Sequence, residues 1–283
     1  MVEDEIDIAH LKAAELLKAE PSLAITHAHD PRQASRYLQS EQFDVVVTDL
    51  SFRDERNLYT ERIKAGKVSL TSDTTFLSSG LQVISDARKY SRRPGLNRGS
   101  GPVRPGIVVW TIMDENRTLQ VFYAHEKLGV RSFCSKSAPA VPRTSGSETG
   151  SLLGAIRKAY DNRAYADAII QPCLPLDQSI HDTIFKDPKW YGVWRMFALG
   201  ISREQNVIKG LGLNVQRING YTGAMYDQIK ILHSLSERNN SGPVSVVYSY
   251  AQMHWEFFLD QVVMRRYPPD GHPWAKLQEP SND

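Results

Sequence analysis

The sequence predicts a doubly wound α/β domain followed by an all-helical region. In the first half of the chain, short apolar segments of strand length alternate with helical patterns, as expected for a parallel sheet with helices on both faces. From about residue 187 onward the strand patterns stop and one helical pattern follows another. The 283 residues are enough for two ordinary domains.

The first strand is the least complete element of the predicted sheet. Only two apolar residues precede the acidic pair Glu3 and Asp4, so this strand is either stunted or the sequence starts late. Residues 8–19 place apolar side chains at helical spacing, and residues 23–28 predict a short strand. Residues 30–40 begin with Asp-Pro, which predicts a capped helix with proline in its first turn.

Three further strands are predicted. Residues 43–49 contain three consecutive valines, which is typical of a strand buried on both faces. Residues 106–111 repeat this pattern, residues 130–134 are predicted to be the next strand, and a helix is predicted between the two over residues 115–127. A helix over residues 151–162 ends the first domain.

Five polar or charged residues stand at or just after the carboxyl ends of the predicted strands, where ligands bind in doubly wound sheets. They are Glu3, Asp4, Asp49, Thr111 and Lys136, in that order along the chain. With these residues on these elements, residues 1–162 resemble the receiver domain of two-component response regulators, whose fold is flavodoxin-like.

The resemblance implies a phosphorylation site. Asp49 would be the phosphoacceptor, Thr111 and Lys136 would contact the phosphoryl oxygens, and the aromatic switch position is held by Phe133. Mg²⁺ is the implied cofactor, because it prefers oxygen ligands and commonly uses one or two carboxylates together with phosphate oxygens. The implied Mg²⁺ ligands are Glu3, Asp4 and Asp49.

Two insertions depart from the receiver pattern. Residues 51–79 replace the short loop after the phosphoacceptor and are mostly polar and irregular, so they could cover the pocket. Residues 88–104 hold six basic residues and no acidic one, which favours a solvated surface over a nucleic-acid contact. We therefore expect control either by phosphorylation of Asp49, with a sensor histidine kinase as partner, or by a phosphorylation-independent signal.

Residues 163–186 are predicted to be a linker, and residues 187–232 a compact helical unit. Asp187 caps the first helix of this unit, Gly-containing turns separate the helices, and Asn214 caps the third helix. Helix, turn and helix form the helix-turn-helix arrangement, in which the second helix of the pair lies in the major groove.

This helical unit resembles the LuxR/NarL-type DNA-binding domain that commonly follows a receiver. The resemblance is carried by Pro188 and by residues 198–202, 211–213 and 217–219. It implies promoter DNA as a partner. The residues expected to contact bases or phosphates are Gln216, Arg217, Asn219 and Tyr221, with Arg203 and Lys209 on the DNA backbone.

Residues 233–283 form an extension that this type of domain does not need. Residues 244–267 are predicted to be a helix too apolar to stand free, so they pack either on the preceding helices or in a homodimer interface. His254 is expected to be a core or interface histidine rather than a metal ligand, because no second ligand follows at i+4.

The composition excludes several classes of protein. With 34 Lys and Arg against 32 Asp and Glu, the net charge of +2 creates no field over the whole molecule that would attract nucleic acid. Two cysteines are too few for a disulfide scaffold or a four-ligand zinc site. No apolar run is long enough to span a bilayer and the N-terminus is acidic, so we expect a cytoplasmic protein with no membrane partner.

The sequence as a whole predicts a DNA-binding transcriptional regulator of the response-regulator type, not an enzyme. The alternative is a protein-interaction regulator that sequesters a partner and whose helical domain does not bind DNA. A stand-alone phosphotransfer enzyme is disfavoured by the helical unit after the first domain.

Overall fold

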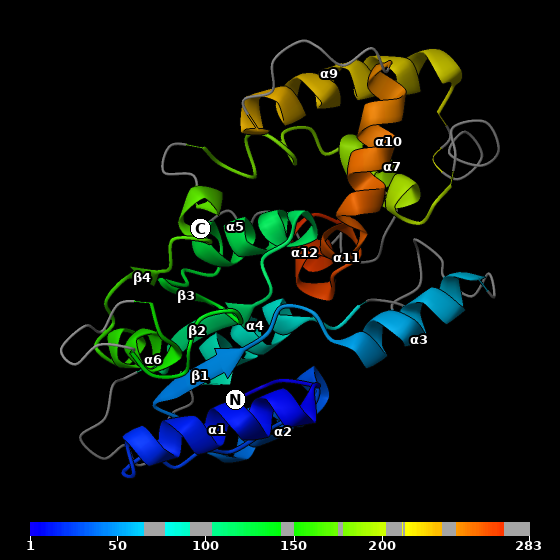
Figure 1. Cartoon of the computed structure of the whole chain (residues 1–283). Coiled ribbons are helices and arrows are strands. Elements are labelled where there is room, and N and C mark those ends of the chain that lie inside the picture. The colour runs from blue at the N-terminus through cyan, green and yellow to red at the C-terminus, as the bar shows by residue number, and fades with distance from the viewer. Residues whose placement is uncertain are drawn as a thin grey trace, which may run out of the picture. The chain divides into compact units, whose positions relative to one another are not determined.

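The computed structural model describes residues 1–64, 77–90, 104–142, 150–174, 178–201, 211, 213–233 and 242–268. The chain divides into two compact units. The first unit comprises Met1–Arg56 and Ser78–Pro175, and the second comprises Asn57–Leu77 and Leu176–Asp283. Figure 1 labels the elements of both units.

A parallel four-stranded sheet is the centre of the first unit (Figure 1). Its strands lie in the order β1 (Val45–Thr48), β2 (Gly106–Thr111), β3 (Ser132–Ser135) and β4 (Tyr165–Ala166). The predicted parallel α/β arrangement is therefore confirmed, and β1, β2 and β3 overlap the strands predicted over residues 43–49, 106–111 and 130–134.

Two isolated bridges continue the parallel pairing beyond β1. Val2 forms one bridge with Thr48 and another with Ala28, so the start of the chain lies between these two segments. The strand predicted over residues 23–28 contributes only this single bridge at Ala28. The acidic pair that follows Val2 is thus placed beside the end of β1.

Five helices accompany the sheet in the first unit. The helices are α1 (Ile6–Ala19), α2 (Pro31–Ser40), α4 (Gly80–Tyr90), α5 (Thr118–Glu126, after the 3₁₀ turn Glu115–Arg117) and α6 (Leu152–Tyr160). Asp30 caps α2 as predicted, since it accepts the backbone N–H of Gln33 at 2.7 Å, and Ser151 caps α6 by accepting that of Gly154 at 3.1 Å.

Apolar side chains cover both faces of the sheet. Val108 and Trp110 pack in one core with Leu16 of α1 and Leu152 of α6. The alternate residue Val109 is also fully buried, because successive side chains of a strand point to opposite faces. Burial on both faces explains why these strands are continuous apolar runs rather than alternating patterns.

The first unit extends past the predicted domain end at residue 162. Tyr165 begins β4, and its hydroxyl donates to the carbonyl of Ser151 at 3.1 Å. The backbone N–H of Ser151 donates back to the same hydroxyl at 2.8 Å. The beginning of the predicted linker is therefore part of the sheet domain.

The segment predicted to be irregular after Asp49 contains a helix, α3 (Arg53–Lys64). Its residues are good helix formers without an apolar stripe, so periodicity gave no signal for it. Leu77, at the far end of the same segment, belongs to the second unit, where its N–H donates to Leu259 at 3.2 Å. Residues 65–76 and 91–103 of the two predicted insertions lie outside the described residues.

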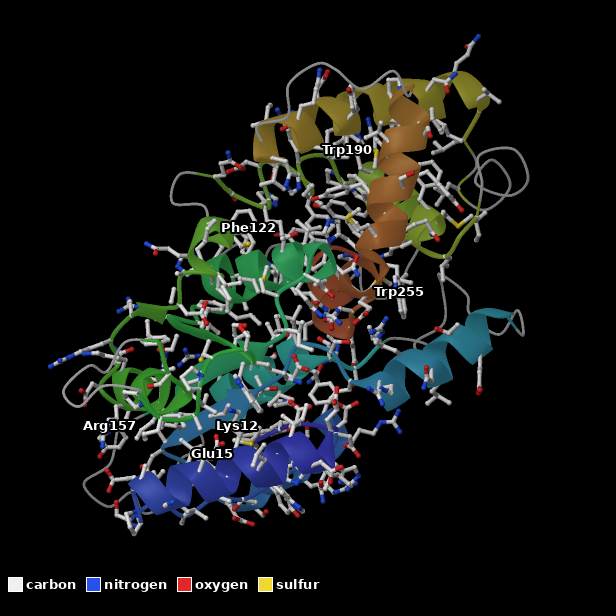
Figure 2. The ribbon with its side chains drawn as sticks, viewed as in Figure 1. Lys12, Glu15, Phe122, Arg157, Trp190 and Trp255 are labelled. Atoms are coloured by element: carbon white, nitrogen blue, oxygen red, sulfur yellow. The ribbon has the colours of Figure 1, made fainter. Side chains whose placement is uncertain are left out.

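Helices dominate the second unit. Its described helices are α7 (Trp190–Ala198), α9 (Val215–His233), α10 (Pro243–Met253), α11 (Trp255–Phe258) and α12 (Gln261–Arg266). All residues of α7 are buried, including Trp190 in its first turn (Figure 2). The predicted helix over residues 202–210 lies outside the described residues.

Aromatic rings fill the centre of the second unit. Trp194 stacks on Phe258 with ring centroids 4.7 Å apart, and Phe185 stacks on Tyr267 at 3.9 Å. The indole N–H of Trp194 donates to the carbonyl of Ile184 at 2.8 Å, so the polar atom of this buried ring is satisfied. The apolar extension thus packs within the unit, as one of the two sequence interpretations expected.

Residues 243–266 form three helices rather than the single helix predicted. The first break is at His254, which is 2% exposed with its ring 4.4 Å from that of Tyr250, as expected for a core histidine. The second is at Asp260, whose carboxylate accepts the N–H of Val262 at 2.7 Å and begins α12. Among the described residues, no helix is both long and apolar enough to cross a membrane.

Candidate functional site

Backbone hydrogen bonds connect the ends of five segments at one edge of the sheet. The N–H of Asp49 donates to the carbonyl of Val2 at 3.1 Å, and the N–H of Glu3 donates to that of Ala28 at 3.0 Å. On the other side, the N–H of Lys136 donates to the carbonyl of Thr111 at 3.0 Å. These bonds fix the backbone positions of the residues whose polar side chains form the site.

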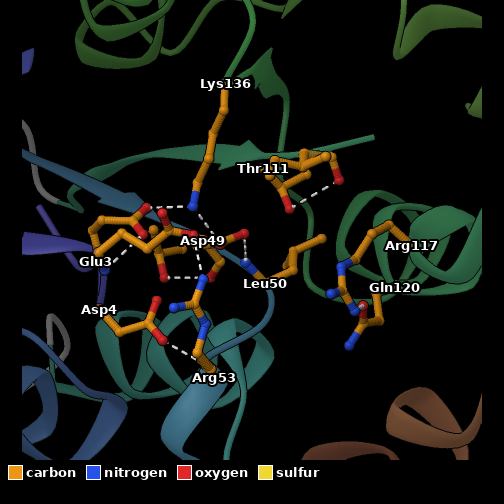
Figure 3. Close-up of polar contacts among 12 residues, drawn as sticks. Glu3, Asp4, Asp49, Leu50, Arg53, Thr111, Arg117, Gln120 and Lys136 are labelled. Carbon is orange, nitrogen blue, oxygen red and sulfur yellow. Dashed lines mark hydrogen bonds and ion pairs between the residues drawn. The ribbon is translucent and has the colours of Figure 1, made fainter. Parts of the chain in front are cut away.

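Three charged side chains meet at this edge. The Nζ atom of Lys136 lies 2.6 Å from Oε2 of Glu3 and 2.7 Å from Oδ2 of Asp49 (Figure 3). The exposed fractions of these side chains are 7% for Lys136, 0% for Glu3 and 9% for Asp49. We call these three residues the carboxylate pocket. Its members come from three separate segments, so the fold assembles it.

Burial and charge act against each other in the carboxylate pocket. Burial raises the pKa of Glu3 to about 7, with repulsion from Asp49 adding to the rise and Lys136 opposing it. Burial alone would lower the pKa of Lys136, but attraction by Asp49 and Glu3 outweighs it and raises the pKa. Lys136 therefore stays charged, whereas the carboxyl group of Glu3 is partly protonated near neutral pH.

The Asp49 carboxylate is bound by the next residue of its own loop as well as by Lys136. Its Oδ1 accepts the backbone N–H of Leu50 at 2.6 Å. Gly80, the first residue of α4, lies directly against the Asp49 backbone, and a Cβ there would come within 1.9 Å of the Asp49 carbonyl oxygen. Sequence reasoning missed this residue, because a glycine that starts a helix gives no sign of a close approach from a distant segment.

Asp4 does not join the other two carboxylates. Its Oδ2 accepts the backbone N–H of Arg53, the first residue of α3, and so caps that helix from a distance. The side chain of Arg53 points toward Asp49 in Figure 3. Its Nη2 lies 3.5 Å from Oε1 of Glu5, and 71% of the side chain is exposed. Arg53 was not predicted as a site residue, because it lies in the segment that showed no periodicity.

Trp110 and Thr111 end β2, and Phe133 lies on β3, three residues before Lys136. Thr111 is fully buried, and its hydroxyl donates to the carbonyl of Ile112 at 3.5 Å. Phe133 is also fully buried, with its ring 6.1 Å from that of His125. Lys136 Nζ lies 5.5 Å above the centre of the Trp110 ring. The indole of Trp110 is therefore next to the charges of the pocket.

The carboxylate pocket has some of the properties of a magnesium site. The space between Glu3 and Asp49 accommodates a cation, since Lys136 Nζ touches both carboxylates. Two carboxylates are a usual protein contribution for Mg²⁺ when phosphate oxygens complete its ligands. Among the described residues, no group of three His, Cys, Asp or Glu side chains is arranged to hold a metal ion, which is consistent with the separate position of Asp4.

The N-terminal half of α9 carries the predicted DNA-contacting residues. Asn214 accepts the backbone N–H of Arg217 at 2.9 Å, so it caps the helix as predicted. The inner stripe consists of Ile218, Met225 and Ile229, which are all buried. Gln216, Arg217 and Asn219 are exposed and Tyr221 is half-buried, whereas Arg203 and Lys209 lie outside the described residues.

The chain was also compared with known proteins. No protein-family model matches it, and no curated protein sequence matches it.

Proposed function

We propose that the protein is a DNA-binding regulator of the response-regulator type, with an atypical receiver domain that accepts a phosphoryl group on Asp49. The observation that carries this proposal is the carboxylate pocket, in which Lys136 bridges Glu3 and Asp49 at 2.6 and 2.7 Å. A buried aspartate beside a cation at the end of a parallel strand has the environment that phosphoryl transfer to a carboxylate requires.

The order of the paired segments supports a receiver-like fold. Counting the bridges of Val2, the segments lie in the order Ala28, Val2, β1, β2 and β3. Numbered along the chain, this is the order 2-1-3-4-5 of flavodoxin-like sheets, whose ligands bind at the switch point between the first and third segments. Glu3 and Asp49 follow those two segments, and β4 is an addition to that order.

The chemistry of the first unit would be a transfer of one phosphoryl group. A carboxylate oxygen of Asp49 attacks the phosphorus of a phosphohistidine or an acyl phosphate, and a P–O bond forms as the bond to the leaving group breaks. The electron pair of the broken bond stays with the leaving group. Lys136 neutralises charge on the phosphoryl oxygens, and Thr111 is placed on the neighbouring strand to donate a hydrogen bond to them.

Glu3 and Asp49 are the residues that would hold Mg²⁺. The ion would supply further neutralisation of the phosphoryl oxygens. Asp4 contributes indirectly, because its carboxylate holds the first N–H of α3. Phe133 is the residue that would report the state of the pocket to the surface of the sheet domain, as the aromatic switch does in receivers.

The second unit would be the output domain. Its helix α9 presents Gln216, Arg217 and Asn219 to solvent at the end that Asn214 caps. Amide and guanidinium groups are the ones that read bases in the major groove and bind phosphates. A homodimer bound to two half-sites would be the assembled form.

Phosphorylation is tested with a small acyl phosphate and Mg²⁺. The wild-type protein is expected to gain the mass of one phosphoryl group, and Asp49→Asn is expected to gain none. Asp44→Asn is a matched control, because it removes a carboxylate at the opposite end of β1. An unchanged wild-type mass, or an equal gain in Asp49→Asn, would refute a phosphoacceptor role for Asp49.

DNA binding is tested by selecting duplexes from a random pool and measuring their affinity against salt. We expect Arg217→Ala to weaken binding. The slope of log K against log salt concentration should become shallower by about one, because one phosphate contact is lost. Arg265→Ala, an exposed arginine of α12, is the control of equal charge. If no duplex is selected at low salt, with or without beryllofluoride, the partner-sequestering alternative replaces the transcription regulator.

A further inference from the structure

The carboxylate pocket contains more negative than positive charge once a phosphoryl group is bound. Glu3 and Asp49 can carry two negative charges, and Lys136 supplies one positive charge. On phosphorylation the single negative charge of the Asp49 carboxylate is replaced by the charge of the acyl phosphate, about −1.5 to −2 near neutral pH. A loaded pocket therefore needs positive charge beyond that of Lys136, from Mg²⁺ and from the protein.

Arg53 is the described cation best placed to supply that charge. Its side chain points toward Asp49 (Figure 3). Its backbone is fixed beside the pocket, because Asp4 accepts the Arg53 N–H and Glu3 is the neighbour of Asp4 in the chain. The Arg53 backbone is thus held in place, while 71% of the side-chain surface is exposed to solvent.

The contact that now holds the guanidinium is a weak one. Arg53 Nη2 and Glu5 Oε1 are 3.5 Å apart, and 37% of the Glu5 side chain is exposed. An exposed ion pair of this length contributes little, because solvent screens it and two long side chains must be ordered. A phosphoryl group can accept two parallel hydrogen bonds from one guanidinium, a stronger arrangement than the pair with Glu5.

We propose that Arg53 is an anion clamp of the carboxylate pocket: its guanidinium leaves Glu5 and binds the phosphoryl oxygens when Asp49 is loaded. This inference rests on the proposed phosphoacceptor function. It makes the start of α3 part of the site, so the helix that replaces a short loop has a chemical role. The group recognised is a tetrahedral anion bound to Asp49.

Beryllofluoride with Mg²⁺ is the probe, because it imitates a phosphoryl group on a carboxylate without covalent transfer. Its affinity is measured on the full chain by ¹⁹F NMR, which detects the bound fluoride directly. Arg53→Ala is expected to weaken binding about tenfold or more, the effect of losing a hydrogen bond between charged groups. The variant keeps the backbone N–H that Asp4 accepts, so α3 keeps its cap.

Two further variants separate a clamp from a general effect of charge. Arg53→Lys keeps the charge but not the planar fork, so its affinity is expected to lie between those of wild type and Arg53→Ala. Arg36→Ala removes an exposed arginine of α2 and is expected to bind like wild type. Thermal unfolding of each variant checks that the fold is retained.

The possible results separate failure of the Arg53 clamp from failure of Asp49 as the phosphoacceptor. If wild type binds beryllofluoride through Asp49 and Arg53→Ala binds within about twofold of it, the clamp is refuted and the phosphoacceptor function stands. Equal losses in Arg53→Ala and Arg36→Ala would also refute the clamp, since they indicate only a long-range field. If wild type does not bind, or Asp49→Asn binds equally, the proposed function fails and the clamp fails with it.

Discussion

The two units use their buried side chains for different purposes. The first gathers Glu3, Asp49 and Lys136 at one edge of its sheet, where each charge depends on the others. The second stacks rings such as Trp194 and Phe258 at its centre. Stacked rings stabilise a fold, whereas a buried ionic cluster adds little stability and is costly once incomplete. The first unit thus buries charges that depend on one another, whereas the second buries a packed aromatic core.

The largest expected effect is in the aromatic core of the second unit. Trp194→Ala removes the stack on Phe258 and the hydrogen bond to Ile184, and should lower the free energy of unfolding by about 4 kcal/mol. Urea denaturation followed by circular dichroism measures this loss. Trp194→Phe keeps a ring against Phe258 and should lose less. Equal stability of Trp194→Ala and wild type would show that the stack is not a structural core.

Lys136→Met should have the next largest effect, in the first unit. It leaves two buried carboxylates without their cation and should lower the free energy of unfolding by about 3 kcal/mol. The same denaturation experiment is repeated after adding Glu3→Gln and Asp49→Asn to the variant. These changes remove the unpaired charges and should restore part of the loss. If they deepen the loss, Lys136 acts through packing and not through charge.

Two glycine substitutions should have effects of opposite sign. Gly80→Ala forces a Cβ against the Asp49 backbone and should destabilise the protein by about 2 kcal/mol, with weaker beryllofluoride binding. Gly220→Ala, on α9, puts its Cβ into open space and should stabilise the protein by up to about 1 kcal/mol. Denaturation midpoints compare the two. A Gly80→Ala variant with the denaturation midpoint and beryllofluoride affinity of wild type would contradict the close approach of α4 to Asp49.

The smallest expected effect is a difference in pH dependence between the units. The pKa of Glu3 is raised from 4.5 to about 7 in the folded protein, so its contribution to stability is present below pH 4.5 and is lost as the pH rises through about 7. Burial lowers the pKa of His233 from 6.5, so its contribution is present above pH 6.5 and is lost as the pH falls through the folded value.

The measurement is the difference in unfolding free energy between wild type and each variant across that pH range, in metal-free buffer. Against Glu3→Gln the advantage of wild type should shrink as the pH rises, and against His233→Asn it should grow. Two slopes of the same sign would contradict burial as the main cause of both pKa shifts, because burial disfavours the charged form of an acid and of a base alike.

The sequence predicted much of the sheet and of the carboxylate pocket. Runs of valine and isoleucine placed β1 and β2, because strands buried on both faces need continuous apolar residues. Their ends then placed Asp49 and Thr111 on one edge. Strand β4 was missed, since its two residues are too few to show a period.

The parts that were not predicted depend on contacts between distant segments. The cap that Asp4 provides for α3 joins residues 49 positions apart, and no local pattern encodes it. The close packing of Gly80 on Asp49 is of the same kind. In the second unit, the breaks at His254 and Asp260 lie inside an apolar run whose composition alone indicated one helix, although Asp260 is a capping residue type.

Reductive trapping would show whether Asp49 accepts a phosphoryl group in the carboxylate pocket. After reaction with a small acyl phosphate and Mg²⁺, borohydride reduces an aspartyl phosphate to the corresponding alcohol, and peptide mass spectrometry locates it. We expect one reduced site, at Asp49, that is lost in Asp49→Asn and diminished in Lys136→Met. Reduction at another carboxylate, or at none, would contradict it.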